Sequence, residues 1–235
     1  MYTAFIGDSF CQAYHHHSDW PHIVNRARKT EIAPYGFGGK SWWFSWSNFV
    51  YYYADKLDQV DAMVFCHTES NRINTNTPDN ARLPNNFWVE HLSSEVQQAY
   101  KSYVTYFHDQ QFNDWAQQRF FEHLAQNYSQ IKMVHLHCFP HSVSWSNLLP
   151  GAVFSTPLQL LAIGGVSQTT LDRDPNYLNG DALRNHLTVK NNQALAHTVI
   201  QALDNYSPGI REVDFTDFNL PNQYGMDQYL IYNDI

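Results

Sequence analysis

Short apolar segments alternate with long helical patterns along this chain, and the alternation constrains the fold more than any other feature. Residues 2–6, 60–66 and 131–138 have the composition of buried strands, and 30–35 is a weaker fourth. Apolar residues at helical spacing cover 42–57, 93–107, 112–128 and 187–204. Strands that alternate with helices predict an α/β fold, a three-layer α/β/α arrangement around a mainly parallel central sheet.

The length and composition indicate one globular domain. The chain has 235 residues, of which 43% are hydrophobic and 15% charged, and no linker or internal repeat interrupts it. We therefore expect a single domain over 1–235. Apolar residues lose their regular spacing after Ser207, so 207–235 is expected to be an irregular C-terminal segment.

Charge and cysteine content argue against several classes of protein. The formal net charge is -8 and no run is rich in Lys or Arg, so nucleic acid is not an expected partner. The apolar stretches are too short to span a membrane. No signal-peptide pattern precedes the first strand, which favours a cytoplasmic or virion-associated protein. Three cysteines are too few for a disulfide framework, so reduced thiols are expected.

Gly7-Asp8-Ser9 directly follows the first predicted strand. Functional sites in parallel sheets form at the carboxyl ends of strands. A nucleophilic serine needs that exposure together with the field of a helix N-terminus. Ser9 is therefore a candidate nucleophile, with helix capping as the alternative interpretation.

His186 lies immediately before the last predicted helix. A catalytic base needs an imidazole whose second nitrogen is held by an acceptor. A loop fixed against a helix start provides that rigidity. Because the chain has 13 histidines, a solvated loop histidine is the alternative interpretation.

Taken in order, these segments resemble the sequence blocks of the SGNH (GDSL-like) hydrolase family. The similar segments are Gly7-Asp8-Ser9-Phe10, residues 35–41, residues 64–71, and Asn185-His186-Leu187-Thr188 followed by Asn191 and Asn192. The resemblance spans most of the chain. It implies the flavodoxin-like SGNH hydrolase fold.

The resemblance also implies a set of site residues for acyl transfer. Ser9 would be the nucleophile and His186 the base, with Gly39 and Asn71 in the oxyanion hole. In strict register Glu69 stands where the family has its asparagine. A carboxylate cannot donate a hydrogen bond unless protonated, so Asn71 is the favoured donor.

The acid of the triad departs from the family pattern as well. Leu183 occupies the position, three residues before His186, where the family usually has aspartate. Asp181 is the nearest carboxylate and would orient His186. A backbone carbonyl in that role would leave a Ser-His dyad.

The implied function is a serine esterase or deacylase that needs no metal or cofactor. The substrate would be a small-molecule or carbohydrate ester, and an aromatic content of 16% favours an acetylated carbohydrate. The alternative is a catalytically inactive SGNH-like module that binds glycans or protein. Glu69, Leu183 and the aromatic, glycine-rich segment 36–46 favour that alternative. Oligomeric state is left open.

Two further motifs suggest other chemistry. Gly39-Lys40-Ser41 resembles the end of a phosphate-binding loop, but Pro34 stands where that motif needs glycine. The histidines and cysteine near the end of the segment 131–138 have metal-ligand character, and two of them would share one strand face. These residues are His135, His137, Cys138 and His141. We favour a polar end of a buried strand there and no metal site.

Overall fold

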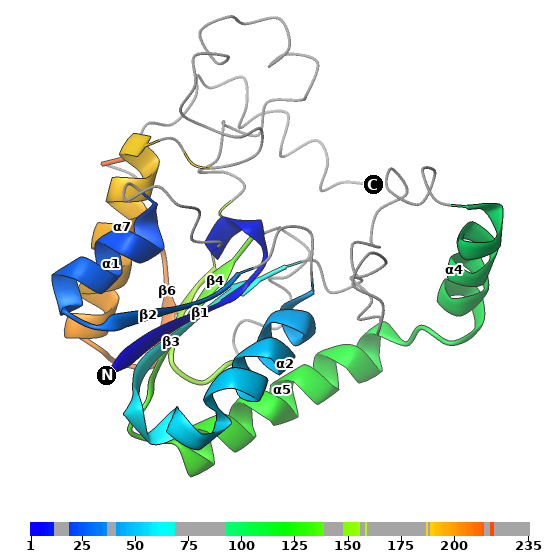
Figure 1. The fold of residues 1–235 in the computed structure, drawn as a ribbon, viewed down its shortest axis with the longest axis horizontal. Helices are drawn as coiled ribbons and strands as arrows, with labels where there is room; N and C mark the ends of the chain where they lie inside the picture. Colours follow the sequence, from blue (N-terminus) through cyan, green and yellow to red (C-terminus); the bar gives the residue numbers. More distant parts are fainter. Residues whose placement is uncertain are drawn as a thin grey trace, which may run out of the picture.

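The computed structural model describes residues 1–11, 19–36, 41–68, 93–138, 148–155, 158, 187, 189–213 and 217–218. Within these ranges the chain alternates between strands and helices (Figure 1). The strands are β1 (Tyr2–Gly7), β2 (Glu31–Gly36), β3 (Val60–His67), β4 (Lys132–His137), β5 (Ala152–Phe154) and β6 (Gly209–Arg211). The α-helices are α1 (Trp20–Arg28), α2 (Trp42–Tyr53), α4 (Ser94–Tyr106), α5 (Gln110–Asn127) and α7 (Val189–Asp204), and short 3-10 helices cover Ser9–Cys11 and Ala54–Gln59.

The strands form one sheet in the order β2-β1-β3-β4-β5-β6, and every neighbouring pair is parallel. The first five follow the flavodoxin-like doubly wound order, with β6 added at one edge. The predicted α/β class with a parallel central sheet is confirmed. The strand order reverses between β1 and β3, and that point is where such folds place their ligands.

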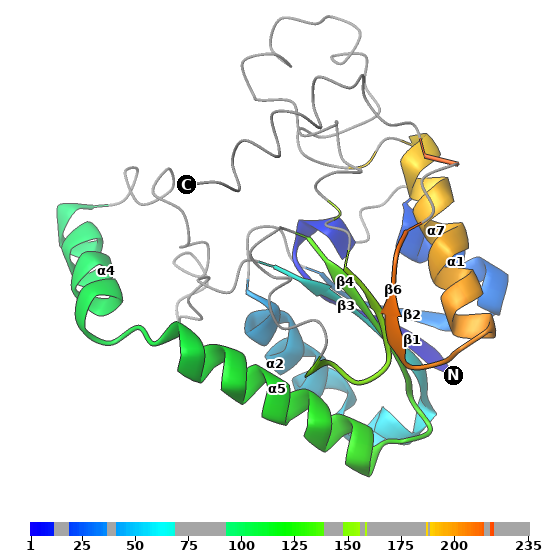
Figure 2. The same ribbon diagram turned by 180° about the vertical axis from the view of Figure 1, so that it is seen from behind.

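Two helix pairs cover the two faces of the sheet (Figures 1 and 2). α1 and α7 pack on one face, where Trp20 and Leu195 join Phe5 of β1 in a buried cluster. α2 and α5 pack on the other face, where Phe49 and Phe121 join strand residues in a second cluster. Each large apolar side chain buried in these layers contributes roughly 1.5–3 kcal/mol.

Three short elements were not predicted from the sequence. α1 has nine residues, with a single helical repeat at Trp20, Ile23 and Val24, and β5 and β6 have three residues each. Elements of this length show too little periodicity to separate them from loops. β6 lies within the segment 207–235, which we had expected to be irregular.

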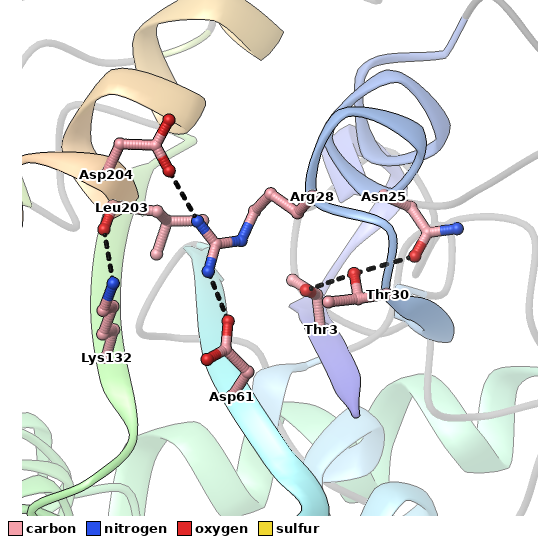
Figure 3. Close-up of polar contacts among 8 residues, drawn as sticks. All are labelled: Thr3, Asn25, Arg28, Thr30, Asp61, Lys132, Leu203 and Asp204. Carbon is pink, nitrogen blue, oxygen red and sulfur yellow. Dashed lines mark hydrogen bonds and ion pairs between the residues drawn. The ribbon is translucent and has the colours of Figure 1, made fainter.

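Polar contacts tie the helices to the amino-terminal end of the sheet (Figure 3). The Arg28 guanidinium of α1 binds Asp61 of β3, and its Nη1 lies 2.9 Å from Oδ1 of Asp204 at the end of α7. Nearby, Lys132 Nζ donates to the Leu203 carbonyl at 2.8 Å. One arginine therefore joins α1, α7 and the central strand at the end opposite the candidate site.

Candidate functional site

The carboxyl ends of β1 and β3 meet at the switch point of the sheet. Gly7, the last residue of β1, pairs with Gly36 of β2 on one side and with Cys66 of β3 on the other. Asp8 and Ser9 follow directly and lead into the 3-10 helix Ser9–Cys11. The predicted nucleophile therefore lies at the edge where open α/β sheets form their sites.

Gly7 is required by a close approach of backbone to backbone. A Cβ at this position would lie 2.4 Å from the Cys66 carbonyl oxygen and 2.7 Å from the Cys66 Cβ. The Gly7 carbonyl in turn accepts a hydrogen bond from the buried Ser45 hydroxyl of α2. Contacts with β3 and α2 thus fix the start of the turn.

The Asp8 carboxylate holds the turn from inside the protein. Asp8 is fully buried, and its Oδ1 accepts from the Phe10 N–H at 3.0 Å and from the Cys138 thiol at 3.4 Å. An aspartate that accepts from a backbone N–H two residues later forms a local turn of its own. Asp8 therefore supplies a capping acceptor at this turn. The side chain of Ser9 lies outside what the structure describes, so nucleophile and helix cap both stay predictions for it.

A chain of hydrogen bonds runs from this turn to the start of α7. The Trp20 indole Nε1–H donates to the Phe10 carbonyl at 2.7 Å, and the Trp20 N–H donates to Asn192 Oδ1 at 3.0 Å. Asn192 Nδ2 then donates to the Leu187 carbonyl at 3.1 Å. The residue directly after Ser9 is thereby linked to the residue directly after the proposed base.

Other predicted site residues lie outside the part of the chain that the structure describes. These are Gly39, Glu69, Asn71, Asp181, Leu183 and His186, together with Lys40 and His141. Ser41 is described. It is buried, and its Oγ accepts from the Phe44 N–H at 3.3 Å, as an N-cap of α2 does.

The three cysteines are buried and free, as the sequence predicted. Cys66 lies between Cys11 and Cys138, beneath the Ser9 turn. Burial raises the pKa of the Cys66 thiol well above its ordinary value, and burial also raises the pKa of Cys138. Thiols in this state are poor nucleophiles and serve as packing.

Stacked histidines occupy the opposite face of the same strands, against α5. His67 Nε2 lies 2.9 Å from His135 Nδ1, and His135 Nε2 lies 2.7 Å from the Pro150 carbonyl oxygen. Because a carbonyl only accepts, the proton of His135 must be on Nε2 and its Nδ1 must accept from Nε2–H of His67. The contacts define one tautomer for each ring.

Burial keeps these rings neutral. It lowers the pKa of His67 well below its ordinary value and lowers the pKa of His135 to about 3. The predicted sharing of one face by His135 and His137 is confirmed, since both stack near His67, whereas Cys138 belongs to the opposite cluster. Among the described residues, no group of three His, Cys, Asp or Glu side chains is arranged to hold a metal ion.

The sequence did not indicate the residues that secure the Ser9 turn. Ser45 and Trp20 had no predicted role, and Asn192 was noted only as part of the last sequence block. The Trp20-Pro21 pair is a signal for a helix start. Nothing in that pair points to a partner 172 residues away in the chain.

The solved structures to which this chain is similar include two esterase-type proteins. No model of a known family and no curated protein matches the sequence. A lipolytic protein of the G-D-S-L family from Desulfitobacterium hafniense DCB-2 is 16% identical over 59% of this chain, with a TM-score of 0.28. A carbohydrate esterase, described as having divergent catalytic and non-catalytic binding functions, is 14% identical over 87%, with a TM-score of 0.40.

The chain spans 60% and 64% of the lengths of these two proteins, respectively. Both TM-scores are low, so the fold is established by the strand order and not by these similarities. In the described part of the chain, no helix is long and apolar enough to cross a membrane.

Proposed function

We propose that this chain is a serine esterase or deacylase in which Ser9 attacks an ester carbonyl and His186 accepts its proton. The observation that carries the proposal is the bonded path from Phe10 through Trp20 and Asn192 to Leu187. It couples the turn bearing the nucleophile to the backbone next to the base. A Ser-His pair needs a fixed relative geometry, and a coupling between the two backbone segments supports it.

The reaction has two steps. Ser9 Oγ bonds to the acyl carbon while its proton passes to His186, and the alcohol leaves with that proton. Water then attacks the acyl-enzyme with His186 as base, which releases the acid and restores Ser9. Asp181 or a backbone carbonyl orients the imidazole.

The negative oxygen formed in each step needs hydrogen-bond donors. We assign this role to the backbone N–H groups of Ser9 and Gly39 and to the Asn71 side chain. Loss of one such donor typically costs about 3 kcal/mol of transition-state stabilisation. For the substrate we propose an acetylated carbohydrate, because aromatic rings suit sugar faces and aromatic residues make up 16% of the chain.

Labelling by a fluorophosphonate probe and hydrolysis of p-nitrophenyl acetate test the proposal. Ser9→Ala should abolish both, and His186→Ala should reduce hydrolysis by about a thousandfold or more, because an unactivated hydroxyl is a poor nucleophile at neutral pH. Ser47→Ala and His123→Ala are matched controls, since both side chains are exposed. Activity that survives Ser9→Ala, or that EDTA removes, would overturn the proposal.

Further variants separate the open assignments. Asp181→Asn should cause a large loss if Asp181 orients His186, and a small one if a carbonyl does. Asn71→Ala should be severe and Glu69→Gln mild if Asn71 is the oxyanion donor. A folded protein that neither labels nor hydrolyses but binds acetylated glycans would instead support the non-catalytic module that Glu69 and Leu183 favour.

A further inference from the structure

The helix α4 and the start of α5 expose an unusual amount of apolar surface. α4 has no buried residue at all. The exposed side chains are Tyr103 (40%), Val104 (41%), Tyr106 (76%), Phe107 (75%), Phe112 (60%) and Trp115 (55%). We refer to these six side chains as the aromatic arm.

The arm extends away from the body of the domain. Both views show α4 beyond the N-terminal end of α5, on the side remote from β1 and α1 (Figures 1 and 2). Phe112 and Trp115 have ring centroids 6.2 Å apart on one face of α5. A 13-residue helix with no buried side chain is marginal in water, because most helical stability comes from packing an apolar face.

The size of the exposed area matches a protein interface. With about 200 Å² for each fully exposed large side chain, the fractions above amount to roughly 700 Å². The largest apolar patch on a typical monomer is about 300–600 Å². A stable interface buries about 800 Å² on each partner.

The charge of the arm favours a second copy of the same chain. Between Lys101 and Arg119 the acidic residues are Asp109 and Asp114, so this stretch has no formal net charge in a chain whose total is -8. Two copies therefore meet here without the repulsion expected from the rest of the surface. A partner chosen by charge would require a charged surface on the arm.

We propose that the aromatic arm is the surface through which two copies of this chain form a two-fold symmetric dimer. In such an interface the same patch meets itself, and aromatic rings of one copy pack against those of the other. The two arms together supply about the area of a standard interface. The proposal is independent of the hydrolase assignment, because it involves neither Ser9 nor α7.

Sedimentation of the full chain at increasing concentration tests the dimer. Interfaces of this size have dissociation constants from micromolar downward, so the wild type should be mostly dimeric at about 100 µM. Phe107→Glu combined with Phe112→Glu should weaken association at least about tenfold, because it buries like charges at the centre of the patch. The matched control is Tyr51→Glu with Tyr52→Glu on α2, where the rings are 82% and 59% exposed. It should dimerise like the wild type.

A second readout locates the contact. Tyr106→Cys should give a covalent dimer with a short bismaleimide, whereas Tyr51→Cys on α2, outside the arm, should not. The native cysteines are buried and should not react. Circular dichroism verifies that the exposed-site variants fold. A wild type that stays monomeric throughout, an arm variant that dimerises as tightly as the wild type, or a monomer that instead binds neutral lipid vesicles would each overturn the proposal.

Discussion

Asn192 offers the most direct test of how the Ser9 turn and the start of α7 are coupled. Its side chain accepts from the Trp20 N–H and donates to the Leu187 carbonyl. Asn192→Ala removes both bonds. Each contributes about 1 kcal/mol net, and the partly buried groups left unpaired add to that, so the free energy of unfolding should fall by about 2–4 kcal/mol.

Asn192→Ala should lower the catalytic rate by more than the loss of folded protein can explain. If Asn192 positions the backbone beside His186, its loss lets the base shift relative to Ser9. A displacement of about 1 Å can cost about a hundredfold in rate. We expect Asn192→Ala to lower kcat by that order with little change in KM, measured with p-nitrophenyl acetate below the unfolding transition.

Asn192→Asp separates the two bonds. It keeps the acceptor for Trp20 but replaces the donor to Leu187 with a carboxylate facing a carbonyl. Stability should recover in part while kcat stays low. Gln193→Ala, at the exposed next position of α7, should change neither. If Asn192→Ala loses stability but retains wild-type kcat, the bonded path is structural only and the reasoning is refuted.

The remaining predictions concern stability, packing and thiol chemistry. His67 and His135 are neutral in the folded state and take up protons on unfolding. Their contribution to the free energy of unfolding is therefore complete above about pH 6.5 and is lost as the pH falls toward 3. The loss amounts to at most about 1.4 kcal/mol per pH unit for each ring. In urea titrations between about pH 7 and pH 5, His135→Gln should lose less stability than the wild type, because one buried ring that takes up a proton on unfolding is gone. An equal loss would contradict the assignment. Gly7→Ala should lower the unfolding free energy by more than about 2 kcal/mol because its Cβ overlaps β3. Gly209→Ala, also at a positive φ but with open space around it, should cost less in thermal unfolding, and equal costs would argue against the overlap. Denatured, non-reduced protein should contain three free thiols, and finding only one would be incompatible with the structure. The same thiols should react slowly with a thiol reagent while the protein is folded, because they are buried.

The long elements of the fold were predictable because they bury whole stripes of apolar residues. The predicted strand 60–66 became β3 (Val60–His67), which lies in the middle of the sheet with nearly every residue buried. The predicted helix 93–107 became α4, with Ser93 as its N-cap. Sequence pattern could not show that the apolar face of α4 stays exposed, because periodicity specifies a face and not what covers it.

The site was predictable only where local rules apply. A glycine, an acidic residue and a serine at a strand end indicated the turn at Ser9. The contacts that secure it come from Ser45, Trp20 and Asn192, which approach only in the folded sheet. Side-chain partners separated by such distances along the chain leave no mark in periodicity or spacing.

The strand order also determines how the sheet can grow while the chain is being made. After β1 and β2 have paired, β3, β4, β5 and β6 join one edge in the same order in which they leave the ribosome. α7 emerges near the end of this sequence, yet it covers the apolar side of α1 and completes the Arg28 bridge between Asp61 and Asp204. The nascent chain must therefore carry the apolar face of α1 without this cover until α7 has been synthesised, and apolar surface exposed at that stage is prone to aggregation.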